Sequence, residues 1–391
     1  EVDDFLSKHK SDVKVESPVV DLSILSDCIG NLKRHKAAGP DNICNEHIIF
    51  GGVQLQVHIC LLFTAMLRHS FFPDAFQFGV IVPLLKNKHG DASKLDMYRA
   101  ITLSVAMSKL FEHVLLSLFG ESLVSDNLQF GFKKDSSCSH ALFTFGETVK
   151  YFTSRGSKIY SVSLDASKAF DKVLHHGLFI KMLKKGISPS FVQLLYKWYG
   201  NLCCCVSWNG ILSESFKIKC GVRQGGVLSP YLFSLYIDNL IQLLKNSGFG
   251  AYIADIFAGC ILYADDILLL SCSCKGLQQL VKLCETYANQ WDICFNPCKC
   301  QAITFGGKAP AQLNCSINSI PIQWVNKLKY LGVSFLSGTC RIDVSNAIGK
   351  FYGSFNNILS VLGNNRNEMA AVHLIKTYCL PTLLWSSNSN S

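Results

Sequence analysis

Two aspartates lie side by side at the tip of an expected β-hairpin. Asp265 and Asp266 separate two apolar segments, residues 261–263 and 267–270, which have the composition of buried strands. Carboxylates next to an apolar core are costly unless something neutralises them. An ordinary turn would also produce this pattern, because aspartate is common in turns.

A second expected strand end carries another aspartate. Asp165 directly follows residues 158–164, which alternate polar and apolar side chains, and precedes residues 169–185, which have a helical period. Carboxylates at the ends of two neighbouring strands could hold two divalent cations roughly 3.5 to 4 Å apart, the geometry of two-metal phosphoryl transfer. Hard oxygen ligands suit Mg²⁺, which binds through carboxylates together with substrate phosphates.

The elements around these aspartates interleave strands and helices without a strict βαβ repeat. Asn209-Gly210 predicts a hairpin between residues 203–208 and 211–218, and Ser229-Pro230 predicts the start of a helix that reaches about residue 244. The remaining patterns indicate helices at 277–291 and within 344–380, and strands at 301–305 and 329–335. This order predicts an α+β fold with an antiparallel sheet and helices packed on one face.

The composition of the 391 residues, 49% hydrophobic and 17% charged, excludes a disordered chain or a coiled coil. Lysine and arginine number 37 against 28 acidic residues, and the net charge of +9 suits a polyanionic partner without identifying one. The 18 cysteines are scattered through apolar segments, which predicts reduced, mostly buried thiols rather than a disulfide framework or a zinc site.

The longest uncharged run, residues 48–67, contains glycines, glutamines and a histidine, so we expect a buried helix and no membrane partner. The chain does not begin with methionine and ends in a polar stretch. We therefore expect it to be part of a longer protein.

Three segments carry a resemblance to a known family. Residues 164–173 (LDASKAFDKV), 221–230 (GVRQGGVLSP) and 262–266 (LYADD) resemble, in this order, motifs A, B and C of reverse transcriptases, and those of non-LTR, LINE-type retrotransposons above all. Further blocks in the family's order are residues 36–41 (KAAGPD), 82–86 (VPLLK), 98–104 (YRAITLS), 129–132 (QFGF), 296–299 (NPCK), 330–332 (YLG) and 374–384.

The resemblance implies a right-hand polymerase of fingers, palm and partial thumb, with an antiparallel palm sheet backed by helices. On this basis residues 1–30 form an N-terminal leader segment and residues 31–150 the fingers. Residues 151–337 form the palm with interleaved fingers elements, which holds motifs A to E, and residues 338–391 form the partial thumb.

The implied activity is that of an RNA-directed DNA polymerase, which transfers a nucleotide from a dNTP to a primer 3′-hydroxyl. The resemblance implies two Mg²⁺ ions, with Mn²⁺ as a substitute. Position by position, Asp165 and Asp265 become the principal metal ligands and Asp266 the third metal-binding catalytic carboxylate. The main-chain carbonyl of Ala166 completes the metal shell. Lys299 becomes the motif D lysine that protonates the leaving pyrophosphate.

The same resemblance implies a dNTP-binding set. Lys86 and Arg99 match residues that hold the triphosphate, whereas Arg223 and Gln224 match those that contact the nucleotide and the template. Gly225 would let the backbone come close to the nucleotide.

Phe170, five residues after Asp165, matches the position whose ring excludes a ribose 2′-hydroxyl. Its spacing with Val173 and Leu174 equally allows a core residue.

The implied partners are an RNA template, a DNA primer and dNTPs, within a longer polyprotein that also carries an endonuclease and C-terminal regions and acts in the nucleus. Two alternatives remain open. One is a catalytically inactive or domesticated relative that only binds nucleic acid, as substitutions such as Asn42 for glycine and Ala100 for proline would suggest. The other is a different palm enzyme, such as an RNA-dependent RNA polymerase, against which Phe170 and the Tyr-Ala-Asp-Asp sequence speak.

Overall fold

The computed structural model describes residue 2 and residues 18–87, 90–307, 315–338, 341–363 and 367–381. Much of the predicted leader and the end of the predicted thumb, including Trp385, lie outside these residues. The chain divides into two compact units, each assembled from three segments. The first unit comprises Glu1–Ser125, Lys168–Asn239 and Trp291–Ile293; the second comprises Asp126–Ser167, Leu240–Gln290 and Cys294–Ser391.

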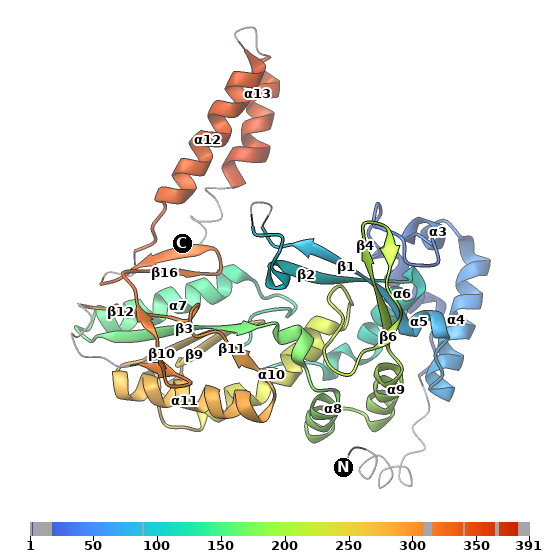
Figure 1. Ribbon diagram of the computed structural model, residues 1–391, viewed down its shortest axis with the longest axis horizontal. Coiled ribbons are helices and arrows are strands. Elements are labelled where there is room, and N and C mark those ends of the chain that lie inside the picture. The colour runs from blue at the N-terminus through green and yellow to red at the C-terminus, as the bar shows by residue number, and fades with distance from the viewer. Residues whose placement is uncertain are drawn as a thin grey trace. The chain divides into compact units, whose positions relative to one another are not determined.

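The first unit combines a sheet with a largely helical body (Figure 1). Its strands run in the order β2-β1-β4-β5, with β6 also on β4; β1 is antiparallel to β2 and parallel to β4. The strands are β1 (Phe78–Leu85), β2 (Tyr98–Ser104), β4 (Cys203–Trp208), β5 (Ile211–Leu212) and β6 (Phe216–Lys217). The predicted hairpin is confirmed, because Asn209 and Gly210 have positive φ angles of 50° and 82° between β4 and β5.

The helices of the first unit enclose an aromatic core. Phe63, Phe72, Phe76, Phe111 and Trp198 contact one another through stacked and edge-on rings. The helices are α2 (Leu22–Gly30), α3 (Asn45–Ile49), α4 (Gly52–His69), α5 (Asp74–Gln77), α6 (Ala106–Phe119), α8 (His175–Lys184), α9 (Pro189–Gly200) and the first part of α10 (Ser229–Lys245), with the 3₁₀ turns η1 (Leu95–Met97), η2 (Gly120–Ser122) and η3 (Ala169–Lys172).

The continuous helix expected over residues 169–185 is wrong, since the chain forms η3 and α8 with a break between them. The carbonyl oxygens of Phe170 and Val173 accept hydrogen bonds from the amides of Val222 and Gly221. These carbonyls are therefore not available to a helix, and the break follows from pairing with a distant segment.

The second unit is built on a sheet with the order β15-β12-β3-β10-β9, to which β11 adds on β3. All of these pairs are antiparallel except β12 with β15. The strands are β3 (Ile159–Ser167), β9 (Cys260–Tyr263), β10 (Asp266–Ser271), β11 (Cys294–Phe295), β12 (Gln301–Phe305) and β15 (Gln323–Trp324). This sheet confirms the expected α+β fold with an antiparallel sheet.

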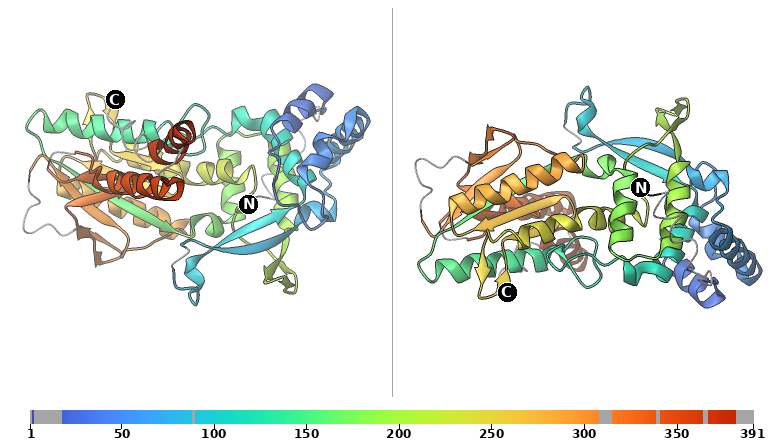
Figure 2. Two further views of the ribbon diagram at one scale, coloured as in Figure 1. Left: turned by 90° about the horizontal axis from the view of Figure 1, so that it is seen from above. Right: turned by 90° about the horizontal axis from the view of Figure 1, so that it is seen from below.

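Helices cover both faces of this sheet, not one as the pattern suggested. Leu268 and Leu270 of β10 belong to a buried cluster with Phe145 of α7 (Cys138–Thr153). The alternate residues Ile267 and Leu269 point to the opposite face. There α11 (Cys274–Gln290) packs against β10 and crosses the sheet as seen from below (Figure 2).

Smaller elements complete the second unit. They are the hairpins β7 (Tyr252–Ile253) with β8 (Ile256–Phe257), β13 (Ser316–Ile317) with β14 (Ile320–Pro321) and β16 (Lys327–Tyr330) with β17 (Val333–Leu336), and the helices α12 (Ser345–Leu362) and α13 (Glu368–Leu374) with the π-helical turn η4 (Ile375–Cys379). The second part of α10 also belongs here.

Membrane-spanning helices and disulfides were also considered in the sequence, and both can be stated for the described residues. No helix among them is long and apolar enough to cross a bilayer. Seventeen cysteines lie within them, and all are free thiols.

Candidate active site

The pairing of β3 with β10 brings the distant aspartates together. Asp165 is the direct register partner of Asp266, which lies 101 residues further along the chain. Directly opposed residues of antiparallel strands have Cα atoms about 4.5 to 5.5 Å apart and point to the same face. Asp265 precedes Asp266 in the turn that joins β9 to β10. The two strand ends inferred from the sequence therefore do converge.

The three carboxylates share one electrostatic environment. Burial, followed by the charges of Asp265 and Asp165, raises the pKa of Asp266 to about 6. Three ionised carboxylates so close together repel one another, and a bound cation would reduce this repulsion. The directly opposed pair is Asp165 with Asp266, whereas the sequence emphasised Asp165 with Asp265.

Lys299 supplies a positive charge at this cluster. Its Nζ atom lies 3.3 Å from Oδ2 of Asp165, with the two side chains 60% and 37% exposed. The backbone at Asp165 in β3 is also bound to the segment that precedes Lys299, because the amide of Asn296 donates to the carbonyl of Asp165 at 3.0 Å. An exposed pair of this kind contributes at most about 1 kcal/mol to stability, so its position matters more than its strength.

Ala166, the predicted source of a main-chain metal ligand, is buried in β3 opposite Phe295 of β11. Its neighbour Asp165 is half-buried. Successive side chains of a strand point to opposite faces. The side chain of Asp165 therefore lies on the face of the carboxylate cluster, and that of Ala166 lies on the other face.

The donor set expected from the sequence, carboxylates and the backbone carbonyl of Ala166, has the chemistry that suits a hard divalent cation. Within the described ranges, no group of three or more histidine, cysteine, aspartate or glutamate side chains is arranged so that it could hold a metal ion by itself. Mg²⁺ usually binds through one or two protein carboxylates and completes its shell with water and substrate phosphates. Asp165 and Asp266 match that requirement.

Gln224, a predicted nucleotide contact, lies in the first unit with its side chain oriented by Asp171. Its Nε2 atom donates to Oδ1 of Asp171 at 2.7 Å. Its carbonyl accepts from the amide of Thr102 in β2 at 2.8 Å. Gly225 follows with φ 111°, and a Cβ atom there would lie 3.1 Å from the carbonyl oxygen of Thr102. This turn therefore favours glycine.

Arg223, by contrast, turns its guanidinium into the core of the first unit. It is 9% exposed, donates to the carbonyl of Phe76 at 3.1 Å and lies over the ring of Trp198. Burial raises the pKa of the Glu112 carboxyl, and the charge of Arg223 acts in the opposite direction. The side chain that was expected to meet a nucleotide instead supports the loop from within.

Glu112 anchors the same loop. Its Oε2 accepts from the amide of Leu228 at 2.8 Å, directly before α10 begins. Carboxylates are favourable at helix N-termini, where backbone amides lack partners. No role for Glu112 or Asp171 was predicted from the sequence. A lone acid within an apolar helix stretch, and a second aspartate in motif A, were the available signals.

Phe170 is half-buried, and one face of its ring stacks on Phe233 with centroids 4.5 Å apart. Packing on one face leaves the ring partly exposed, so the structure accommodates both of the roles considered for it.

Lys86 and Arg99 are exposed at the end of the β1–β2 pair, where Arg99 opposes Leu84. The Nζ atom of Lys86 donates to the carbonyl of Asp96 at 2.9 Å. Lys168 binds the carboxylate of the same aspartate at 2.6 Å. These cations therefore gather at one hairpin of the first unit.

An antiparallel sheet with two opposed strand-end carboxylates and a third in the adjoining turn is the class of site that polymerases use for two-metal phosphoryl transfer. The sequence matches the family described as reverse transcriptase (RNA-dependent DNA polymerase) over residues 86–335, and the chain belongs to this family. The family predicted from the motifs is thus confirmed.

Relatives agree with this assignment. The chain is 28% identical over 324 residues to the RNA-directed DNA polymerase from mobile element jockey of Drosophila funebris, covering 80% of this chain and 35% of that protein. It is 25% identical over 325 residues to the Retrovirus-related Pol polyprotein from type-2 retrotransposable element R2DM of Drosophila melanogaster, covering 80% and 30%. The chain thus spans about a third of the length of these relatives.

A solved structure, telomerase from Candida albicans with a fragment of telomeric RNA, is similar with a TM-score of 0.49 and 11% identity, covering 85% of this chain and 60% of that one.

Proposed function

We propose that the chain is the polymerase part of an RNA-directed DNA polymerase encoded by a non-LTR retrotransposon. The observation that supports this most is the register of β3 against β10, which opposes Asp165 and Asp266 beside Asp265. Membership of the reverse transcriptase family supplies the reaction class, namely transfer of a nucleotide from a dNTP to a primer 3′-hydroxyl.

In this proposal the carboxylates of Asp165, Asp265 and Asp266 and the carbonyl of Ala166 hold two Mg²⁺ ions. When bound, such ions lower the pKa of the attacking hydroxyl and neutralise charge on the phosphates. Mn²⁺ is a substitute with the same preference for oxygen ligands. Lys299, already beside Asp165, gives its proton to the departing pyrophosphate.

The nucleotide-binding residues in this proposal are those that match the family's motifs. Lys86 and Arg99 neutralise the triphosphate from the β1–β2 hairpin. Gln224, oriented by Asp171, contacts the incoming nucleotide, and Gly225 lets the backbone come close. The exposed part of the Phe170 ring excludes a 2′-hydroxyl. Arg223 acts indirectly, through the loop that it supports from the core.

The proposed partners are an RNA template, a DNA primer and dNTPs, and the proposed context is a polyprotein with an endonuclease and C-terminal regions. The relatives are about three times longer than the matched segment, which supports a larger context. Extension of a primer in chromosomal DNA would place this activity in the nucleus.

A primer-extension assay tests the proposal. Wild-type protein and the D265N variant are given RNA or DNA templates, dNTPs or NTPs, and Mg²⁺, with D255N as the matched control. Asp255 is an exposed aspartate between β7 and β8, in the same unit as Asp265. We expect deoxynucleotide extension on RNA that D265N abolishes and D255N retains.

Two other outcomes would reject the proposal. A preference for NTPs would indicate an RNA polymerase. Template binding without extension, measured by fluorescence anisotropy on the same wild-type preparation, would indicate the inactive relative that only binds nucleic acid.

A further inference from the structure

The turn that carries Asp265 has a strained backbone and an unusual support. Ala264, directly before Asp265, has a φ of 56°, in the left-handed region that residues with a Cβ atom rarely adopt. Such conformations persist only when the surroundings hold them. Something outside the hairpin must therefore fix this turn.

Gln129 provides that support. Its side chain is fully buried, and its carboxamide oxygen Oε1 accepts from the amide of Ala264 at 2.9 Å. Its Nε2 atom donates to the carbonyl of Ala264 at 3.3 Å. One side chain thus satisfies both backbone groups of the residue before Asp265, although it lies 135 positions away.

Gly131 allows this approach. Its amide donates to the same Oε1 atom of Gln129 at 3.0 Å. A Cβ atom at Gly131 would lie 2.5 Å from the backbone nitrogen of Ala264, closer than any real contact of this kind. The glycine is required for its small size, because any side chain would displace the turn.

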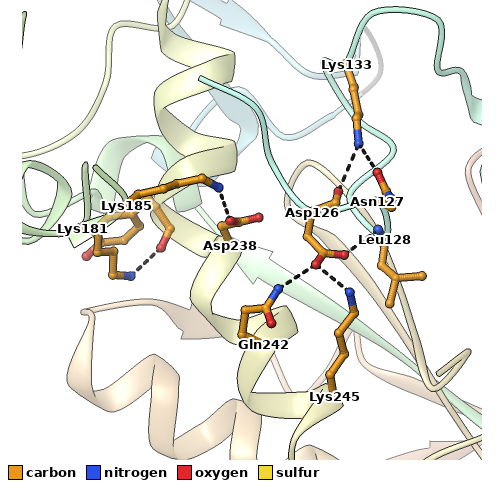
Figure 3. Close-up of polar contacts among 10 residues, drawn as sticks. Asp126, Asn127, Leu128, Lys133, Lys181, Lys185, Asp238, Gln242 and Lys245 are labelled. Carbon is orange, nitrogen blue, oxygen red and sulfur yellow. Dashed lines mark hydrogen bonds and ion pairs between the residues drawn. The ribbon is translucent and has the colours of Figure 1, made fainter. Parts of the chain in front are cut away.

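The segment is attached to its own unit at the other end through Asp126 (Figure 3). The Oδ2 atom of Asp126 accepts from Nε2 of Gln242 at 2.7 Å and from Nζ of Lys245 at 2.6 Å, both on α10. Its carbonyl accepts from the amide of Gln129 at 3.0 Å.

The middle of the segment pairs with β9, the strand that leads into the turn. The amide of Phe130 donates to the carbonyl of Leu262 at 2.8 Å, and the amide of Leu262 donates to the carbonyl of Leu128 at 2.9 Å. The segment is thus tied both to the strand and to the turn.

We propose that residues 126–131 form a brace in which Gln129 is a positioning residue that fixes the Ala264–Asp265 backbone, and with it the carboxylate of Asp265. This inference rests on the proposed function and extends it to residues outside the carboxylate cluster. A buried carboxamide that bonds both backbone groups of one residue restrains position without adding charge beside the carboxylates.

The test compares Q129M, which keeps the side-chain volume but removes the three hydrogen bonds, with G131A, which leaves Gln129 intact and displaces the turn. Three properties are measured: amide hydrogen exchange at Ala264, Mn²⁺ binding to a complex with a 3′-deoxy-terminated primer and dNTP, and the single-turnover incorporation rate.

We expect both variants to exchange the Ala264 amide faster and to bind Mn²⁺ more weakly. Removing groups that orient metal ligands typically costs about 10- to 100-fold in affinity or activity, and we expect a loss of this size in the incorporation rate. The dNTP KM should stay within about threefold, because the nucleotide-binding residues are untouched.

Two controls separate positioning from stability. V149A removes buried volume from α7 in the same unit and should lower thermal stability without changing Mn²⁺ binding or the rate per folded molecule. N127A removes the contact between Asn127 and Lys133 on the outer side of the brace and should leave all three properties unchanged.

The proposal would be overturned if Q129M and G131A bound Mn²⁺ and incorporated nucleotides as the wild type does. It would also be overturned if their losses only matched those of V149A. A wild-type protein that does not extend primers would reject the proposed function instead, while amide exchange and Mn²⁺ binding would still decide whether the brace positions Asp265.

Discussion

Gln224 and Asp171 are joined by a hydrogen bond of 2.7 Å from the carboxamide to the carboxylate. Asp171 lies six residues after Asp165 and Gln224 belongs to motif B, so this bond couples two sequence motifs within the first unit. A charged acceptor strengthens a hydrogen bond and narrows the orientations of the donor. Asp171 thus restrains the side chain that we propose contacts the nucleotide.

Removing this acceptor should weaken nucleotide binding. For D171A we expect the dNTP KM to rise about 5- to 30-fold, equivalent to about 1 to 2 kcal/mol, because Gln224 must then be ordered at the expense of binding energy. D171N keeps an oxygen acceptor and should stay within about threefold of the wild type. Steady-state kinetics decide the question, and an unchanged KM in D171A would contradict the orienting role.

Phe170 should discriminate against ribonucleotides through its exposed face. F170V is expected to raise the relative kcat/KM for NTPs over dNTPs by at least roughly tenfold, because a smaller side chain leaves room for the 2′-hydroxyl. The control is F233L, which removes the same stacked pair, worth about 0.5 to 1.5 kcal/mol, without shortening Phe170. Equal loss of discrimination in both variants would mean that Phe170 acts only through packing.

Glu112 should stabilise the loop that carries Arg223 and Gln224. E112A leaves the buried amide of Leu228 without an acceptor, so we expect a loss of about 1 to 3 kcal/mol in the free energy of unfolding. The double variant E112A/R223M should lose less than the sum of E112A and R223M, because the charge of Arg223 acts on the carboxyl of Glu112. Urea unfolding measures these values, and full additivity would argue against an interaction between the two side chains.

His175 should make stability depend on pH. Burial lowers the pKa of its ring, whose Nε2 atom lies 2.8 Å from the carbonyl oxygen of Gly221. The contribution is fully present above the unfolded pKa of about 6.5 and is lost as the pH falls through the lower folded pKa, because the unfolded state then binds more protons. H175Q should therefore lose less stability between pH 8 and pH 5 than the wild type does.

The comparison for this prediction is H140Q, which replaces an exposed histidine of α7. Its urea midpoints at the two pH values should follow the wild type. A variant H175Q that follows the wild type equally closely would show that the ring does not contribute to the pH dependence.

Periodicity and turn chemistry predicted elements of both units. Strand β12 occupies the expected residues 301–305, and α10 begins at the expected Ser229-Pro230. Motif order likewise predicted that Asp165 and Asp265 would approach each other. These features are local, or follow from the family resemblance.

The features that were not predicted depend on contacts between distant residues. Whether Asp165 opposes Asp265 or Asp266 is decided by the register of two strands a hundred residues apart, which no local pattern encodes. Arg223 was expected at a nucleotide, but the positions of Phe76 and Trp198 draw it into the core. The role inferred for Gln129 likewise requires Ala264 to lie beside it.

The segments of the two units alternate along the sequence, so that each unit is assembled from three separate stretches of chain. Trp291 belongs to the first unit, where its ring contacts Lys181, although in the sequence it directly follows the second segment of the other unit. A copy that stops before residue 291 would therefore lack β11 and β12 from one core and this tryptophan from the other. We expect truncated forms of this chain to misfold in both units. Neither unit can be obtained alone by cleaving the chain at one position.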